Sequence, residues 1–286
     1  MGIKNLFSQT HGATRPVWLR DFAGETLAVD ASVILHKGCC GCAREIAMNI
    51  PTDRYLKYFM KVVFNLEKFG VKPLIVFDGQ LFPAKCAENK KREHQRSSSV
   101  KKAIALWNEK KYIDAQRLFS TSVSISEEMV QTVIKSLRAH NVNYIVAPYE
   151  ADAQMAYLSK CGVVQGVITE DSDVLVYGAS KVFTKIDIDH GTAQLVEANR
   201  LDECFDIENW SMAKFRHLCV LAGCDYLPSI PGIGIIRARE FVTKIKDADI
   251  FKAVSRMGLY LGRSIEIPKE YVSNFKKVLS ITLCLI

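Results

Sequence analysis

The stretch GVITEDSDVLVYG, at residues 166–178, places three carboxylates within four positions of an otherwise apolar segment. These are Glu170, Asp171 and Asp173. Two carboxylates about 4 Å apart repel each other by roughly 4 kcal/mol at an effective dielectric constant near 20. A bound cation offsets such repulsion, and hard ions such as Mg²⁺ or Mn²⁺ prefer oxygen ligands. This spacing therefore indicates a metal-dependent chemistry.

Other acids end short runs that are typical of β-strands: TLAVD at 26–30, PLIVFD at 73–78 and GVVQGVITED at 162–171. The intervening segments YLKYFMKVVFNL and MVQTVIKSL have helical apolar spacing. This alternation predicts an α/β fold with a mostly parallel central sheet and helices on both faces. Sites in such sheets form at the carboxyl ends of the strands, so we expect Asp30, Asp78 and Asp171 to lie there together.

Helix starts and turns supply the remaining candidate acids. In VAPYEADAQMAYL the Pro and the acids mark a helix N-terminus near residue 149, where the helix dipole favours the carboxylates of Glu150 and Asp152. Asp173 shares a side with Asp171, whereas Glu170 points the other way and is expected to be structural. Asp225 follows a helix that begins near Met212.

Seven acids are thus expected to converge on one site. Two Mg²⁺ or Mn²⁺ ions in such a site activate a water and stabilise the leaving oxygen of a phosphodiester. The alternative is that each acid is a turn residue or a helix cap. No nucleophile–His pattern and no phosphate-binding GxxxxGK[ST] loop competes with the metal hypothesis. The seven are Asp30, Asp78, Glu150, Asp152, Asp171, Asp173 and Asp225.

The segment FRHLCVLAGCDYLPSIPGIGIIRAREFV predicts two helices joined by a turn that contains Gly232 and Gly234. Glycines allow close approach of the backbone to a ligand, and amides at a helix N-terminus bind phosphate. Such a hairpin contacts the DNA backbone rather than the bases. The alternative is a Gly-rich turn that binds nothing.

The formal net charge of +7 is concentrated in one segment. Ten Lys and Arg and four Asp and Glu lie between residues 80 and 120, a net charge of +6. Lys85 and Arg92 are seven positions apart, which places them on one face of a predicted helix. A charge run of this kind is either a solvated face or a nucleic-acid contact.

The remaining composition excludes several classes of protein. No run approaches the roughly 18 apolar residues of a membrane span, and no signal peptide is present, so no membrane partner is expected. The nine cysteines lie mostly in apolar segments, which favours a reducing compartment. Cys39, Cys40 and Cys42 lack a matching second pair for zinc and are expected to be packing residues.

The motifs together resemble the nuclease domain of the flap-endonuclease superfamily of structure-specific 5′ nucleases. MGIKNL, VDAS, VFDG, APYEADAQMAYL, ITEDSDVLVYG and AGCDYLPSIPGIG resemble its motifs in the right order. LHKG, PTDRY and the Tyr of APYEAD look most like the eukaryotic exonuclease 1 branch. The resemblance implies a single 5′-nuclease domain over 1–286. Its parts are an N-terminal region at about 1–99, a basic helical arch insertion at about 80–128, and an internal region at about 129–286 with a helix-two-turn-helix element at about 212–245.

The resemblance also implies roles for single residues. All seven acids match the family's two-metal ligands, Lys85 and Arg92 its basic gateway, and Gly2 its small N-terminal residue near the DNA. His36 matches a residue that stacks near the displaced 5′ nucleotide. Ser229 and the Ile233 carbonyl match a K⁺ or Na⁺ site, although Ala222 replaces a hydroxyl residue seen in some relatives.

The activity implied by the resemblance is a Mg²⁺-dependent 5′ to 3′ exonuclease on duplex DNA with 5′-flap endonuclease activity. Substrates are expected to be DNA with a 5′ end, nick, gap or flap, in nuclear DNA repair by a monomer. Mismatch-repair partners are expected through a C-terminal tail that this chain lacks. Because the chain stops within the apolar segment FKKVLSITLCLI, we expect a fragment or a variant end. Alternatives are a flap endonuclease proper, a Holliday-junction resolvase, or a non-catalytic DNA-binding scaffold.

Overall fold

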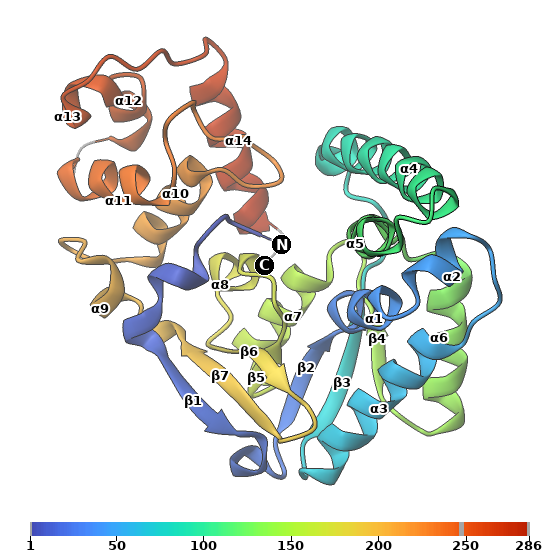
Figure 1. Cartoon of the computed structure of the whole chain (residues 1–286). Coiled ribbons are helices and arrows are strands. Elements are labelled where there is room, and N and C mark those ends of the chain that lie inside the picture. The colour runs from blue at the N-terminus through green and yellow to red at the C-terminus, as the bar shows by residue number, and fades with distance from the viewer. Residues whose placement is uncertain (1, 246–248, 285–286) are drawn as a thin grey trace. The chain divides into compact units, whose positions relative to one another are not determined.

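The computed structural model of the protein describes residues 2–245 and 249–284 (Figure 1). Contacts within the chain divide it into two compact units, neither of which is continuous in sequence. The predicted limits near residues 99 and 128 do not coincide with the limits of these units. The single domain thus stays a prediction. Unit 1 comprises Met1–Val17, Asp152–Ile186 and Ala193–Ile286, and unit 2 comprises Trp18–Ala151 and Asp187–Thr192.

Unit 2 is built on three parallel strands, β2 (Thr26–Asp30), β3 (Lys72–Phe77) and β4 (Tyr144–Val146), in the order β2-β3-β4. Asp30 lies beside Val76 in the register, so the strands end at one edge. The apolar interior of β2 is fully buried, as expected for a parallel strand covered on both faces. The predicted strand TLAVD is confirmed residue for residue.

Helices of unit 2 pack on these strands through apolar stripes. Both α1 and α3 contact β3, and α3 also contacts α6. The period predicted from YLKYFMKVVFNL is confirmed, because Phe59, Val63 and Leu66 on one side of α3 are fully buried. The helices are α1 (Ala31–Cys40), α2 (Ala43–Ala47), α3 (Arg54–Lys68) and α6 (Glu127–Ala139), with a 3₁₀ turn η3 (Leu19–Phe22).

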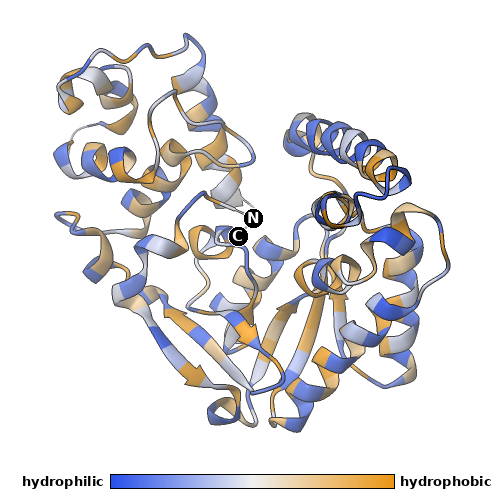
Figure 2. Cartoon of the chain, in the orientation of Figure 1, coloured by the Kyte–Doolittle hydropathy of each residue, from blue (hydrophilic) through white to orange (hydrophobic). Residues whose placement is uncertain are grey.

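The basic insertion is helical, as predicted. After a 3₁₀ turn η4 (Pro83–Lys85) it forms α4 (Cys86–Asn108) and α5 (Tyr112–Ser122), which pack against each other. Ala103 and Phe119 are fully buried in this packing. Figure 2 shows α4 as a mostly hydrophilic helix, whereas β2 and β3 are mostly hydrophobic.

Unit 1 contains the other four strands, in the order β1-β7-β6-β5, with β5 and β6 parallel. The long run at 162–171 yields only a three-residue strand, so Asp171 lies three residues beyond its end. The strands are β1 (Thr14–Trp18), β5 (Gly166–Ile168), β6 (Lys181–Asp187) and β7 (Thr192–Glu197); the 3₁₀ turns are η1 (Phe7–Gln9), η2 (His11–Ala13) and η5 (Ala198–Arg200).

Aromatic side chains form much of the helical core of unit 1. Phe215, Phe241 and Phe275 are fully buried, and α10 contacts both α11 and α14. The helices are α7 (Ala151–Lys160), α8 (Asp173–Tyr177), α9 (Asp202–Phe205), α10 (Met212–Ala222), α11 (Ile235–Lys244), α12 (Ile250–Val254), α13 (Met257–Leu261) and α14 (Tyr271–Cys284).

These strands and helices confirm the α/β class and the parallel pairs. Within residues 2–245 and 249–284, no helix combines the length and apolar character that crossing a bilayer requires.

Candidate active site

Asp30 is a buried carboxylate at the junction of β2 and α1. It is 4% exposed, and its Oδ1 accepts hydrogen bonds from the backbone amides of Ser32 (2.9 Å) and Val33 (3.2 Å). These bonds cap α1 and place a negative charge at its positive end. The fold therefore fixes Asp30 at the carboxyl end of a parallel strand, as the sequence predicts.

Asp78 follows β3 and connects separate segments of unit 2. Its Oδ2 accepts from the Ser32 hydroxyl (2.7 Å), and its Oδ1 accepts from the backbone amide of Ala151 at the start of α7 (2.9 Å). Ser32 thus contacts Asp78 through its hydroxyl and Asp30 through its amide. The sequence analysis did not identify Ser32 as a site residue, although its place two residues after Asp30 was a usable signal.

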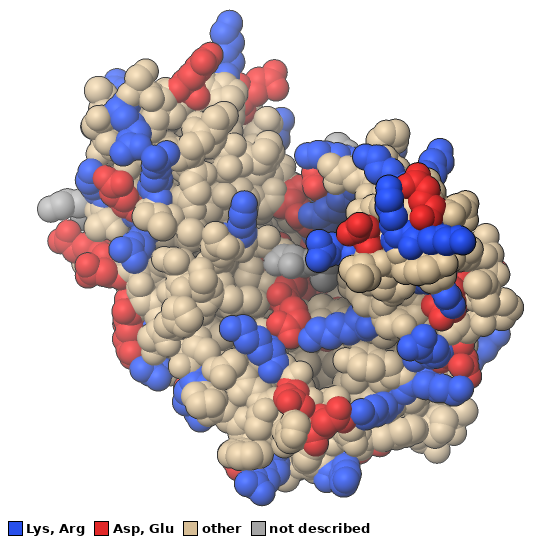
Figure 3. All heavy atoms as spheres, in the orientation of Figure 1, with Lys and Arg blue, Asp and Glu red and all other residues tan. Residues whose placement is uncertain are grey.

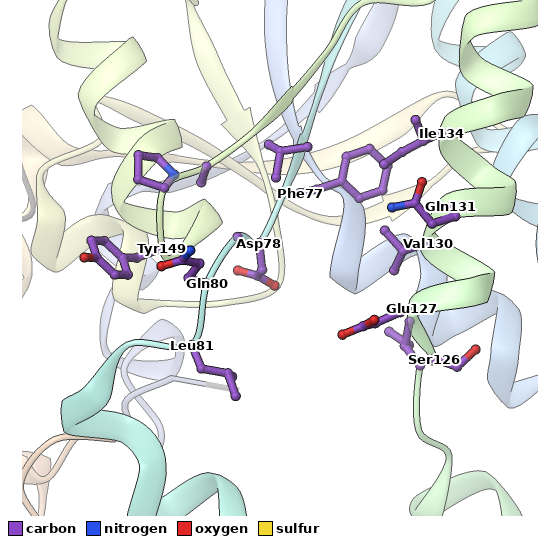
Figure 4. Close-up of a pocket in the computed structure, with 15 residues that line it drawn as sticks. Phe77, Asp78, Gln80, Leu81, Ser126, Glu127, Val130, Gln131, Ile134 and Tyr149 are labelled. Atoms are coloured by element: carbon purple, nitrogen blue, oxygen red, sulfur yellow. The ribbon is translucent and has the colours of Figure 1, made fainter.

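Asp78 also lines a pocket of about 840 Å³ within unit 2 (Figure 4). The end of β3, the start of α6 and the loop after β4 form its walls, which include the apolar side chains of Leu81, Val130 and Tyr149. Leu81 and Tyr149 are exposed. Accessible apolar surface therefore adjoins one of the predicted metal ligands.

Lys85, one of the two predicted gateway cations, contacts a predicted metal ligand directly. Its Nζ lies 2.9 Å from Oε1 of Glu150, and the two side chains are only 17% and 10% exposed. The expected place of Lys85 inside a helix is wrong. Pro83 begins a 3₁₀ turn that Lys85 ends, and α4 starts one residue later.

Arg92 lies in α4, where its Nε donates to Oε1 of Glu88, one turn earlier (3.2 Å). Figure 3 shows Lys and Arg side chains gathered over α4 and α5, with fewer acids among them. The predicted concentration of positive charge on this insertion is confirmed.

The acidic turn of unit 1 is held by backbone donors. The amide of Asp173 donates to Oδ1 of Asp171 (3.0 Å), and the amide of Ile3 donates to Oδ1 of Asp173 (3.0 Å). Glu170 instead accepts from the Thr184 hydroxyl (2.7 Å) and the Lys185 amide (3.0 Å). The prediction that Glu170 is structural is confirmed.

Gly2 lies against the same acidic turn. Its φ is +76°, and a Cβ at this position would lie 2.2 Å from Oδ1 of Asp171 and 2.8 Å from Oδ1 of Asp173. A side chain there would overlap both carboxylates, so only glycine allows the N-terminal segment to approach them. The family resemblance implies a small residue here for proximity to DNA, and that role stays a prediction; the contact in the structure is with the acidic turn.

The last two acids also lie in unit 1. Asp152 is in the first turn of α7, and Asp225 follows α10, both as predicted. Burial, together with the smaller effect of the negative charges of Asp173 and Asp225, raises the pKa of Cys224 to about 11. Asp173 and Asp225 are therefore close enough to Cys224 to act on the same thiol.

A cation fits this donor set chemically, because carboxylate oxygens suit hard divalent ions. Unit 2 carries Asp30, Asp78 and Glu150, and the other four acids are in unit 1. Among the described residues no group of three or more His, Cys, Asp and Glu side chains is placed so as to hold a metal ion. The two-metal assignment stays a prediction.

Of the three neighbouring thiols, Cys39 and Cys42 are packing residues, whereas Cys40 is only partly buried. Cys39 and Cys42 are fully buried. Burial, with a smaller effect of the neighbouring Cys42 and Cys40, raises the pKa of Cys39 to about 12.

His36 lies one turn before Cys40, with its Nδ1 3.6 Å from the Cys40 sulfur. Burial and the nearby Arg96 lower the pKa of His36, which leaves its ring neutral at pH 7.

The predicted helix-turn-helix is formed by α10 and α11. Gly232 has a φ of +81°, and its carbonyl accepts a hydrogen bond from Nη1 of Arg237. Gly234 caps α11, and a Cβ there would meet nothing within 4 Å. Ser229 packs against Gly223, beyond the end of α10. Arg237 was not identified from the sequence, although it lies in the first turn of the predicted second helix.

Comparison with known proteins gives matches over nearly the whole chain. The XPG N-terminal domain model matches residues 1–99, and the XPG I-region model matches residues 141–225. Exonuclease 1 of Danio rerio is 41% identical over 278 residues, which cover 97% of this chain and 34% of that protein. DNA damage-inducible protein DIN7 of Saccharomyces cerevisiae is 37% identical over 260 residues, which cover 90% of this chain and 60% of that protein. The chain thus spans about a third of the length of the first of these relatives.

Solved structures share the fold. The catalytic core of Rad2 in complex with DNA substrate has a TM-score of 0.67 at 22% identity, covering 99% of this chain and 81% of that one. Flap endonuclease-1 from Methanococcus jannaschii has a TM-score of 0.61 at 20% identity, covering 94% and 87%. The eukaryotic junction-resolving enzyme GEN-1 binding with potassium has a TM-score of 0.64 at 19% identity, covering 99% and 64%.

Proposed function

Because this chain belongs to the XPG family of nucleases, we propose that it is a Mg²⁺-dependent 5′ to 3′ exonuclease on duplex DNA that also cuts 5′ flaps. Relatives named exonuclease 1 support this activity, since their similarity covers nearly all of the chain. The contact between Lys85 and Glu150 carries the proposal. This contact places the Lys85 ammonium, which can bind a phosphate, on the predicted metal ligand Glu150.

Seven carboxylates form the proposed metal site. When bound, two Mg²⁺ or Mn²⁺ ions would supply a nucleophilic water and stabilise the leaving oxygen of the phosphodiester. The protein's own part is to orient the ligands: backbone amides hold Asp30, Asp78 and Asp173, and the Ser32 hydroxyl holds Asp78. The ligands are Asp30, Asp78, Glu150, Asp152, Asp171, Asp173 and Asp225.

Lys85 and Arg92 orient the scissile phosphate. Arg92 grips a phosphate through two parallel hydrogen bonds, whereas Lys85 acts as a point charge. Both stabilise the negative charge that develops as the bond breaks. The neutral ring of His36 stacks on the displaced 5′ nucleotide, and Gly2 lets the N-terminal segment lie beside the DNA.

Duplex binding is separate from cleavage in this proposal. Amides around Gly232 and Gly234 contact the phosphate backbone without reading the sequence. The Ser229 hydroxyl and the Ile233 carbonyl of the same hairpin would hold a K⁺ or Na⁺ ion. The potassium in the GEN-1 structure supports such an ion in this fold.

Three other functions are alternatives to an exonuclease. A flap endonuclease proper or a Holliday-junction resolvase would use the same acids, as the structural likeness to flap endonuclease-1 and GEN-1 allows. A non-catalytic scaffold would bind DNA through the hairpin between α10 and α11 and would not require the seven predicted metal ligands. The proposed setting is nuclear DNA repair by a monomer. Mismatch-repair proteins are the proposed partners, and they would bind a C-terminal tail of the kind that the family carries.

Cleavage assays on four DNA substrates test the function. Purified protein is given Mg²⁺ with a 5′-recessed duplex, a nicked duplex, a 5′-flap and a four-way junction. We expect release of nucleotides from the recessed and nicked 5′ ends, together with flap cutting. Cutting of only the flap identifies a flap endonuclease, and symmetrical cutting of the junction a resolvase. Binding of all four without any product identifies a scaffold.

A further inference from the structure

A second cavity, of about 520 Å³, lies wholly within unit 1 and contains none of the predicted site residues. The C-terminal end of α7, the turn from α8 to β6, η5 and the start of α10 form its walls. Its lining includes three cations, Lys160, Lys181 and Arg216, and one acid, Glu197. Cavities of this size are typical of small-ligand sites.

Two of the cations approach the same glycine. Gly178 has a φ of +98°, and a Cβ there would lie 2.8 Å from Cε of Lys160, 3.4 Å from its Nζ and 3.8 Å from Nη2 of Arg216. The missing side chain lets an ammonium and a guanidinium approach one point in the cavity wall. Although Lys160 reaches the surface, partial burial and Arg216 lower its pKa, and burial lowers that of Arg216.

In the part of the chain that the structure describes, no carboxylate forms an ion pair with these two cations. The carboxylate of Glu197 pairs with Arg15, at 3.1 Å. No ion pair within residues 2–245 and 249–284 includes Lys160 or Arg216. The Nε of Arg216 donates to the carbonyl of Val176 (3.0 Å), which fixes one edge of the guanidinium. The cavity therefore holds one guanidinium in a fixed orientation beside an ammonium on a flexible side chain.

We propose that this cavity binds a small, multiply charged oxyanion of the phosphate class. Arg216 supplies the planar fork that matches two phosphate oxygens, and Lys160 supplies a mobile point charge. The Asn199 side-chain amide, which also lines the cavity, adds a neutral donor, whereas the Ser180 hydroxyl pairs with that of Ser159 at 3.1 Å. Of the described lining residues none is aromatic, so the recognised group is the anion and not a base.

A purely structural role makes a different prediction. Arg216 contacts a carbonyl near the C-terminal end of α8, where a cation stabilises the helix dipole. If that were the only role, removing either cation would lower the melting temperature and would leave anion binding unaffected. Binding must therefore be measured directly.

Calorimetric titration of the purified chain with inorganic pyrophosphate, in EDTA and without divalent ions, tests the proposal. We expect a saturable component that Lys160→Gln and Arg216→Gln each weaken about tenfold or more, because each removes a charge-assisted hydrogen bond. Lys214→Gln is the matched control. It removes one cation from the same helix as Arg216, but Lys214 donates to the Glu208 carbonyl (2.7 Å) and does not line the cavity.

Several outcomes overturn the proposal: no saturable binding by the wild type, unchanged affinity in Lys160→Gln, or an equal loss in Lys214→Gln. If Arg216→Gln fails to fold, Lys160→Gln and the charge-retaining Arg216→Lys decide the question. Duplex DNA affinity is measured in parallel. Loss of DNA binding with unchanged pyrophosphate binding in Lys160→Gln makes the cavity part of a DNA surface and also overturns the proposal.

Discussion

Removal of the Asp173 charge is expected to separate cleavage from DNA binding. In the wild type the Ile3 amide donates to Oδ1 of Asp173 at 3.0 Å. Asp173→Asn keeps an oxygen that can accept this hydrogen bond but removes the charge that a metal ion requires. We expect cleavage with Mg²⁺ to fall by more than about 10³-fold, while duplex affinity stays within a few-fold of wild type. Single-turnover cleavage and equilibrium DNA binding measure the two effects.

The matched control for Asp173 is its neighbour Glu170. Glu170→Gln alters an acid of the same turn that bonds Thr184 and Lys185 instead. It should cleave at nearly the wild-type rate. Near-normal cleavage by Asp173→Asn, or an equal loss in both variants, would remove Asp173 from the metal site.

Lys85 and Arg92 should act on the chemical step more than on affinity. Replacing either with Ala is expected to lower the single-turnover rate by about 10²-fold or more, the usual loss of one transition-state donor. Lys85→Ala also removes the ammonium that lies 2.9 Å from the largely buried Glu150 carboxylate, so the melting temperature of this variant is measured as well. Rates at saturating DNA separate the loss of chemistry from the loss of binding.

Lys101→Ala is the control within the same insertion. Lys101 lies in α4, whereas Lys110 has a left-handed backbone (φ +62°) that makes it a poorer choice. If Lys85, Arg92 and Lys101 all lose the same small amount, and only in binding, the insertion is a general electrostatic surface.

At the level of the elements, the hairpin between α10 and α11 has two glycines with different constraints. Gly232 has a positive φ, so a side chain there strains the backbone, whereas the Cβ of a residue at position 234 meets open space. Gly234→Leu should therefore fold normally and still hold phosphate away from the amides. We expect weaker duplex binding, independent of base sequence, in titrations on two unrelated duplexes. Unchanged affinity in both would make the hairpin a structural turn.

Helix α10 also carries a pH-sensitive group. Burial lowers the pKa of His217 below 6.5, Arg216 adds to the shift, and the ring packs on Phe275 of α14. As pH falls through the unfolded-state value near 6.5, the unfolded chain takes up the proton first, so the free energy of unfolding decreases. We expect lower stability at pH 5.5 than at pH 7.5, and a smaller difference in His217→Gln, by urea unfolding.

His190 supplies a control of opposite sign. Its hydrogen bond to Asp187 raises its pKa, so protonation below pH 6.5 adds stability. His190→Gln should make the decline toward low pH steeper. Equal pH dependence in wild type and His217→Gln would exclude His217 as a contributor.

Helices and strands with a regular apolar pattern were predictable from the sequence. Contacts between residues that only the folded chain brings together were not. The limits of β2 and the identities of α3, α6 and α10 follow from local apolar period and from the acids that end or begin each element. Lys85 was misplaced because Pro83 diverts the chain into a 3₁₀ turn. The roles of Ser32 and Arg237 depend on side-chain to backbone contacts that no spacing rule encodes.

For the whole molecule, the two units could not be predicted from a linear reading. Both units are assembled from separate segments, so their limits follow non-local contacts rather than composition. The positive charge, in contrast, could be located in advance, because ten of the chain's 38 Lys and Arg lie in one short insertion. That asymmetry supports DNA as the ligand but does not place the metal ions.

Metal binding should appear as stability of the entire chain. An ion that binds only the folded state stabilises it by about 2.7 kcal/mol at a hundred times its dissociation constant, which raises the melting temperature of a protein of this size by a few degrees. We expect Mg²⁺ or Mn²⁺ to raise the melting temperature of wild type and to do so much less in Asp173→Asn.

EDTA should abolish cleavage and leave duplex binding in place, because phosphate contacts need no divalent ion. Lys160→Gln is the matched control, since its cavity contains none of the seven acids, and it should show the full shift with Mg²⁺. A wild-type melting temperature that does not respond to millimolar Mg²⁺ or Mn²⁺ would contradict binding to the folded protein alone. An equal shift in wild type and Asp173→Asn would place the bound ion away from Asp173.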